Sequence, residues 1–139
     1  MRVLIDLNVI LDVEQNRVPF VQDSALVVDQ VIQRQIEGML PPHCFATLFY
    51  LLRKFTDIDT AHRSIAWHLK HFKACTCDHE LLASASTGPI RDFEDALVAA
   101  SATRHECAYI ITRNITDFSQ SDVPAITPTD FLALRSKHD

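Results

Sequence analysis

"RVLIDLNVILD", residues 2–12, joins a short buried-strand pattern to an aspartate and then to a helical pattern. Residues 2–5 are typical of a buried strand, and residues 7–16 predict a short helix that ends before Pro19. A strand followed directly by a helix is the repeating unit of a parallel sheet, whose crossover helices cover both of its faces. Asp6 stands at the junction of these two elements.

The same alternation of strands and helices continues along the chain. Further helices are predicted over residues 19–38, with Gly38 as the stop, and over 43–55, 59–72, 78–86, from 92 onward, and 127–137 with Thr127 or Thr129 as N-cap. Further strands are predicted over residues 73–77, 107–112 and 124–127. We therefore predict an α/β fold in one domain, residues 1–139, with a short parallel sheet flanked by helices on both faces.

Composition excludes several classes of protein. A chain of 139 residues with 47% hydrophobic content suits one domain with one core. The net charge of -5 argues against nucleic-acid binding through overall positive charge, although a local basic face remains possible. Two glycines are too few for a glycine-rich phosphate loop, and no Gly-x-Ser-x-Gly nucleophile elbow is present.

The chain shows no pattern for export or for a membrane. The first residues carry acids inside the apolar run, unlike a signal peptide, and no apolar run approaches the ~18 residues of a membrane span. Its four cysteines are then expected to be reduced thiols, and we expect a cytoplasmic protein. Cys75, Cys77 and His79 lie close together but lack the C-x-x-C spacing of structural zinc sites.

"RDFED", residues 91–95, crowds three acids at the start of a predicted helix. Capping explains part of this, because Asp92 is a good N-cap and acids are favoured in a first turn. Asp92 and Asp95 also share one face of the helix, three positions apart, whereas Glu94 should be solvated and Phe93 should face the core.

Two other segments bring polar side chains to the same edge of the predicted sheet. Asp6 follows the first strand, and Asn114 and Asp117 follow the strand at 107–112. Capping or turn roles are the alternative for each of them. The carboxyl ends of parallel strands are where open α/β sheets build their sites. Converging carboxylates repel one another unless a cation neutralises them, and oxygen ligands select Mg²⁺ or Mn²⁺.

Four motifs in order resemble the PIN domain, a small α/β nuclease fold found in toxin-antitoxin ribonucleases and RNA-processing enzymes. They are "VLIDLNVILD", "DFEDALVAASA", "IITRNITDF" and "AITPTDFL". The resemblance implies a Mg²⁺- or Mn²⁺-dependent ribonuclease that acts on RNA and has a possible antitoxin partner.

The resemblance also implies roles for single residues. Asp6 and Asp95 match the metal-binding acids of the family, and Asp92 and Asp117 match further acids of a subfamily. The matching polar residues are Asn8, Thr112 and Asn114. Thr47 stands where many members carry an acid on the helix after the second strand.

A phosphodiester substrate also needs positive contacts. Arg113 lies beside the proposed site and is the preferred phosphate contact. Residues 53–73 hold five Lys or Arg against two Asp, a local charge of +3, together with Trp67. Phosphate contact and stacking on Trp67 are possible there, but so is an ordinary solvated helix face with Trp67 in the core.

Two other functions and one assembly state stay open. A haloacid-dehalogenase-like phosphatase could use Asp6 as nucleophile, although Asn8 replaces its usual second Asp and no lysine motif follows. A non-catalytic PIN-like binding module is the second alternative, because Thr47 supplies no carboxylate. A homodimer is expected because one helix carries more apolar positions than it normally buries: Phe45, Phe49, Leu52 and Phe55.

Overall fold

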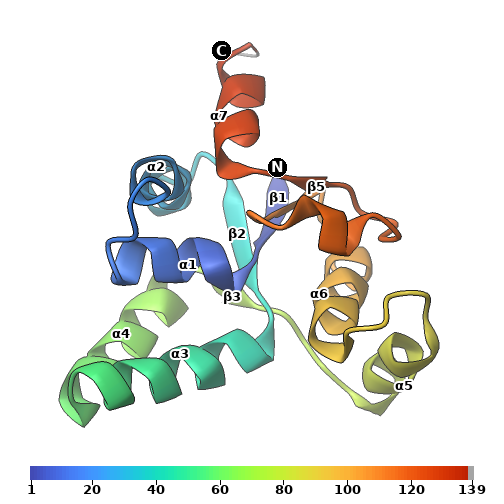
Figure 1. Cartoon of the computed structure of the whole chain (residues 1–139), viewed down its shortest axis with the longest axis horizontal. Coiled ribbons are helices and arrows are strands. Elements are labelled where there is room, and N and C mark those ends of the chain that lie inside the picture. The colour runs from blue at the N-terminus through green and yellow to red at the C-terminus, as the bar shows by residue number, and fades with distance from the viewer. Residues whose placement is uncertain (138–139) are drawn as a thin grey trace.

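The computed structural model describes residues 1–137, which form a five-stranded, wholly parallel sheet in the order β3-β2-β1-β4-β5 (Figure 1). The strands are β1 (Arg2–Ile5), β2 (Glu37–Leu40), β3 (Lys73–Ala74), β4 (Tyr109–Ile111) and β5 (Ala125–Ile126). The helices are α1 (Leu7–Glu14), α2 (Val21–Ile32), α3 (Pro42–Phe55), α4 (Ile58–His71), α5 (His79–Thr87), α6 (Phe93–Arg104) and α7 (Pro128–Ser136), with a 3₁₀ turn η1 (Ile115–Phe118).

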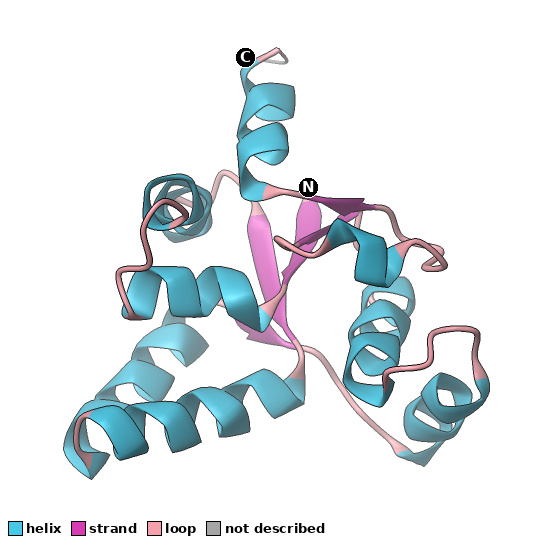
Figure 2. Ribbon diagram, viewed as in Figure 1, coloured by secondary structure: helices cyan, strands magenta, loops and turns pink. Residues whose placement is uncertain are grey.

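Helices cover both faces of this sheet, as Figure 2 shows. Val3 and Ile5 of β1 pack in a core with the helices α1 to α4 and with Phe131 of α7. Leu4 points to the other face and packs with Val98 and Ala102 of α6. This alternation follows from the two-residue period of a strand, and it confirms the predicted α/β class with helices on both faces.

One predicted element is wrong. The helix expected over residues 19–38 ends at Ile32, and residues 37–40 form β2, a strand that the sequence pattern does not predict. A turn separates the two elements, with Arg34 at a positive φ of 59°. Gly38 is therefore not a helix stop. It lies in the strand, where an added Cβ would stand 2.8 Å from Cγ2 of Val31.

The remaining predicted elements are found with small shifts at their ends. Thr127 caps α7, and Asp92 caps α6 by accepting a hydrogen bond from the backbone N–H of Asp95 at 2.9 Å. Phe93, expected in the core, is exposed, whereas Leu97 on the same helix is buried. In residues 1–137 none of the helices has the length and apolar character needed to cross a membrane.

Candidate functional site

Asp6 lies at the centre of a polar network where β1 and β4 end. It caps α1, and its Oδ1 accepts a hydrogen bond from the backbone N–H of Leu7 at 2.8 Å. Its Oδ2 accepts from Oγ1 of Thr112 at 2.9 Å and from the side-chain amide of Asn8 at 3.2 Å. The Asn8 amide also reaches Oγ1 of Thr112 at 3.3 Å. Three sequence-predicted residues therefore meet in one cluster.

The environment of Asp6 disfavours its charged form. Burial raises the pKa of Asp6 above its ordinary value, and the hydrogen bonds from Thr112 and Leu7 oppose that rise. Glu94 raises the pKa further through charge repulsion, whereas nearby His43 lowers it. A cation at this position would relieve the cost of keeping Asp6 ionised.

Asp95 is the most perturbed acid in the first turn of α6. Burial raises the pKa of Asp95 to about 6, and repulsion from four neighbouring carboxylates adds to the rise. In decreasing order of effect these neighbours are Asp92, Asp117, Asp6 and Glu94. The acids that follow β1, begin α6 and follow β4 are thus close enough to repel one another across three separate segments.

His43 of α3 also faces this acidic group. Its Nε2 lies 3.5 Å from Oε1 of Glu94, although the Glu94 side chain remains 61% exposed. Burial lowers the pKa of His43, and the charges of Glu94 and Asp6 oppose that effect. The buried Nδ1 of His43 has no hydrogen-bond partner among residues 1–137. His43 is not among the predicted site residues, because no sequence pattern indicates that the start of α3 lies beside the start of α6.

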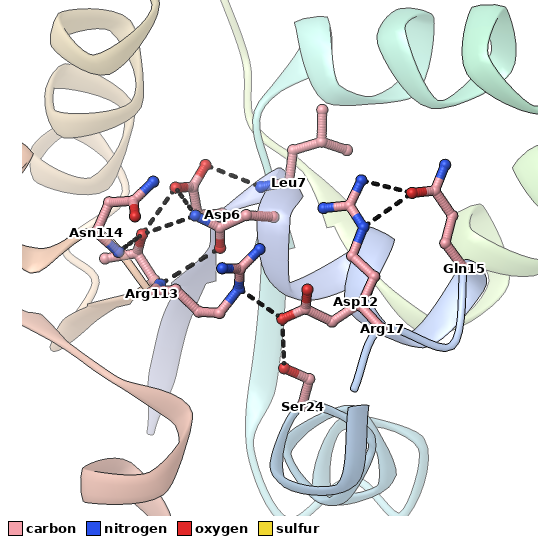
Figure 3. Close-up of polar contacts among 10 residues, drawn as sticks. Asp6, Leu7, Asp12, Gln15, Arg17, Ser24, Arg113 and Asn114 are labelled. Atoms are coloured by element: carbon pink, nitrogen blue, oxygen red, sulfur yellow. Dashed lines mark hydrogen bonds and ion pairs between the residues drawn. The ribbon is translucent and has the colours of Figure 1, made fainter. Parts of the chain in front are cut away.

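Arg113 is held by a buried carboxylate (Figure 3). Its Nε donates a hydrogen bond to Oδ2 of Asp12 at 2.9 Å, and Oγ of Ser24 donates to the same oxygen at 3.1 Å. The guanidinium carbon lies 4.1 Å from the centre of the Phe20 ring, within the range of a cation–π contact. The backbone N–H of Arg113 also donates to Oδ1 of Asn8 at 3.4 Å. Arg113 thus connects the end of β4 to α1 and α2.

The other predicted residues lie at the rim of this group. The backbone N–H of Asn114 donates to Oγ1 of Thr112 at 3.1 Å, and the Asn114 side chain is exposed. Asp117 is exposed on η1. Thr47 is half-buried on α3, one helical turn after His43, so the two share a face of that helix.

The donor set suits a hard divalent cation in its chemistry, because every acid in the group offers oxygen and their repulsion calls for a positive charge. The side chains do not form a closed cage: within residues 1–137 no three His, Cys, Asp or Glu side chains are grouped so that they could hold an ion. The charges of Asp6, Asp92 and Asp117 repel that of Asp95, but in this arrangement the carboxylates do not converge on one ion position.

Comparison with known proteins gives a consistent result. The PIN domain family model matches residues 2–116. The structure of VapBC-1 from nontypeable Haemophilus influenzae is similar with a TM-score of 0.70 and 17% identity, over 93% of this chain and 99% of that chain. The structure of VapBC2 from Rickettsia felis, bound to a promoter DNA fragment, is similar with a TM-score of 0.63 and 12% identity, over 91% of this chain and 98% of that chain. The structure of FitAB bound to a DNA fragment is similar with a TM-score of 0.64 and 21% identity, over 91% of this chain and 94% of that chain. No curated protein matches this sequence.

Proposed function

Because this chain belongs to the PIN domain family, we propose that it is a Mg²⁺- or Mn²⁺-dependent ribonuclease that hydrolyses phosphodiester bonds of RNA. The observation that carries this proposal is the meeting of carboxylates from three segments at the carboxyl edge of the sheet. Asp6 follows β1, Asp95 begins α6 and Asp117 follows β4. A structural role for all of them is hard to reconcile with their mutual repulsion.

In this proposal Asp6 and Asp95 are the main metal ligands, and Asp92 and Asp117 orient water or hold a second ion. Bound Mg²⁺ or Mn²⁺ would supply an activated water and neutralise charge on the phosphate. Thr112 and Asn8 keep the Asp6 carboxylate in place through the hydrogen bonds at 2.9 and 3.2 Å. Their role is to prevent Asp6 from turning away as the substrate binds.

The substrate contacts come from the segment after β4. Arg113 is the proposed phosphate contact, and its ion pair with Asp12 limits the directions in which the guanidinium can point. The terminal nitrogens of Arg113 have no hydrogen-bond partner among residues 1–137, so they are free to meet a phosphate. The exposed side chain of Asn114 would donate a hydrogen bond, without charge, to the sugar-phosphate backbone of the same RNA.

The proposal extends to partners. An antitoxin protein is the proposed regulator, and the support for it is the similarity in fold to structures of VapBC and FitAB. We also propose a homodimer in the cytoplasm. Of the four apolar positions expected to support it, Leu52 is buried and Phe45 and Phe49 pack against the core, so only Phe55, 66% exposed, remains as support. Light scattering that gives the monomer mass at high protein concentration would contradict the homodimer.

A PIN-like binding module without catalytic activity is the second candidate function. It is favoured by Thr47, which brings no carboxylate to the face of α3 that His43 shares. A phosphatase that forms a phosphoenzyme on Asp6 has less support, because Asn8 stands in place of the usual second Asp and donates to Oδ2 of Asp6.

The test compares cleavage of a single-stranded RNA and of the DNA of the same sequence. We expect cleavage of the RNA with Mg²⁺ or Mn²⁺, none with EDTA, and restoration when the metal is added back. Cleavage that survives EDTA would refute metal dependence. Isothermal calorimetry with Mn²⁺ separates the two candidates, because a non-catalytic site should bind the ion only weakly.

A further inference from the structure

The hairpin of α3 and α4, residues 42–71, carries a net positive charge in this acidic chain. This segment holds four Lys or Arg against two Asp, a net charge of +2. The whole chain carries -5, so all other residues together carry -7. A polyanion would be repelled by most of the molecule and attracted to this hairpin.

The cations near the tip of the hairpin have no acidic partner. Arg53, Lys54 and Arg63 are exposed, and no carboxylate lies within 4.0 Å of any of them in the described chain. Asp57 on the hairpin caps α4 by accepting from the backbone N–H of Thr60 at 2.7 Å, a bond that lowers the pKa of Asp57, and the charge of Arg63 helps to lower it without an ion pair between the two side chains. These charges are therefore available to phosphate groups.

Aromatic side chains lie exposed among these cations. Tyr50 is 61% exposed, Phe55 is 66% exposed and Trp67 is 39% exposed. The Nζ atom of Lys54 lies 5.4 Å from the centre of the Phe55 ring. Trp67 is thus not a core residue, and it lies four positions after Arg63, on the same face of α4. Exposed aromatic rings beside cations are the combination that binds single-stranded nucleic acid by stacking and charge.

The hairpin begins at the acidic group itself. The chain enters α3 directly from the carboxyl end of β2, and His43, at the start of α3, lies 3.5 Å from Glu94. In Figure 1, α3 runs from this point toward the lower left, beyond the sheet, and α4 returns from there toward α1. Arg53 is ten residues after His43, or about 15 Å at the rise of ~1.5 Å per residue in a helix.

We propose that the exposed faces of α3 and α4, with Tyr50, Arg53, Lys54, Arg63 and Trp67, bind single-stranded RNA and lead it to the acidic group. This inference rests on the proposed function and names the path of its substrate. Phosphates contact the cations, and bases stack on Tyr50 and Trp67. The acidic group itself gives little affinity for RNA, since its carboxylates repel phosphate. The hairpin therefore supplies most of the binding for any strand long enough to reach it.

The test measures binding without cleavage, in EDTA, by fluorescence anisotropy of labelled oligouridylates of 4 and 12 nucleotides. The double variant Arg53→Gln/Arg63→Gln is expected to bind the 12-mer about 10-fold more weakly than wild type. Its slope of log affinity against log salt should fall by about 1.4, since each lost single-strand phosphate contact removes ~0.7. The matched control Arg34→Gln/Lys137→Gln removes the same charge from exposed positions outside the hairpin and should bind as wild type does.

Trp67, the one tryptophan of the chain, reports on the position of the strand. Its emission should be quenched more strongly by the 12-mer than by the 4-mer, which makes fewer contacts with the hairpin, and Tyr50→Ala should weaken binding of the 12-mer about 10-fold. The inference is overturned if the double variant keeps the wild-type affinity, or if the control loses as much. It is also overturned if polyglutamate of equal charge displaces the 12-mer as well as unlabelled RNA does, because the hairpin would then bind acidic protein equally. Binding by the hairpin without any cleavage would refute the proposed ribonuclease alone.

Discussion

The Nε atom of Arg113 lies 2.9 Å from Oδ2 of Asp12, a carboxylate with no solvent exposure. The pair joins the residue after Thr112 to the middle of α1. It therefore fixes the backbone of residues 112–114 next to Asp6. A residue chosen from the sequence as a substrate contact thus also has a structural part in the site.

Removal of Arg113 should be costly for stability. Arg113→Leu leaves the buried Asp12 charge unpaired, and loss of one partner of a buried pair typically costs about 3–5 kcal/mol. Urea unfolding measures the loss, and Ser24→Ala, which removes a single hydrogen bond to the same oxygen, should cost only about 1 kcal/mol. The double variant Arg113→Leu/Asp12→Leu should recover part of the loss. A cost below about 1 kcal/mol for Arg113→Leu would show that the pair contributes little.

Cleavage should depend on two acids from different segments. Asp6→Asn and Asp95→Asn each keep the side-chain shape and remove one ligand charge, so each should abolish Mn²⁺-dependent cleavage of RNA. Asp29→Asn on the exposed side of α2 removes the same charge away from the site and should leave cleavage unchanged. Activity that persists in both repurified site variants would contradict the proposed mechanism.

A substitution at Thr47 tests the effect of the acid that many PIN domains carry at this position of α3. A glutamate here shares its face with His43, so Thr47→Glu should tighten Mn²⁺ binding about tenfold, which corresponds to ~1.4 kcal/mol. The attraction of one carboxylate at ~4 Å is about 4 kcal/mol at an effective dielectric near 20, before desolvation is subtracted. Calorimetry measures the gain. If the variant melts several degrees lower than wild type and gains no extra stability from Mn²⁺, position 47 does not face the ion.

Gly38 should tolerate no side chain. The Cβ of Gly38→Ala would stand 2.8 Å from Cγ2 of Val31 and 3.0 Å from Cδ1 of Phe72, so we expect a loss of about 1–3 kcal/mol from overpacking. Gly88→Ala is the matched control, because its nearest atom is 3.5 Å away and alanine restricts the unfolded chain. Urea midpoints of the two variants should move in opposite directions. If Gly38→Ala were as stable as Gly88→Ala, β2 would be able to move away from α2 without a loss of folding free energy.

His68 should make stability dependent on pH. Burial lowers the pKa of His68 in the folded state, while Glu14 and the carbonyl of Ser64 oppose the shift and His71 adds to it. The unfolded chain takes up a proton near pH 6.5 and the folded chain does so only at lower pH. The contribution of neutral His68 is therefore complete above about pH 6.5 and is lost as the pH falls below it.

Replacement of His68 should flatten this dependence. The free energy of unfolding of His68→Asn, measured in urea from pH 7.5 to pH 5, should fall less than that of wild type. His79→Asn changes an exposed histidine and should follow wild type. A His68→Asn curve parallel to the wild-type curve would assign the pH dependence to other groups.

The sequence predicts those parts of the molecule whose cause is local. β1 follows from an apolar run, and the caps at Asp92 and Thr127 follow from side chains that bond within the next three residues. β2 was missed because its pattern, "EGML", continues the apolar spacing of α2. Only the packing of the strand against Val31 and Phe72 requires Gly38 there.

The candidate site divides in the same way. Asp6 could be named because the ends of parallel strands meet at one edge, whereas Asn8 and Thr112 were named from the resemblance to the PIN domain. The pairs His43 with Glu94 and Arg113 with Asp12 could not be named, because each joins elements whose relative angle is set by packing. The burial of Asp12 could not be predicted either, because the helical pattern of this segment is equally compatible with an Asp12 side chain exposed to solvent.

The central position of β1 in the sheet has a consequence for synthesis. The ribosome makes β1 first, but its neighbour β4 arrives only at residues 109–111, and the hydroxyl that holds Asp6 belongs to Thr112. A nascent chain therefore carries its first acid long before it carries the group that orients it. Any activity built on Asp6 therefore requires that residues up to Thr112 have been synthesised.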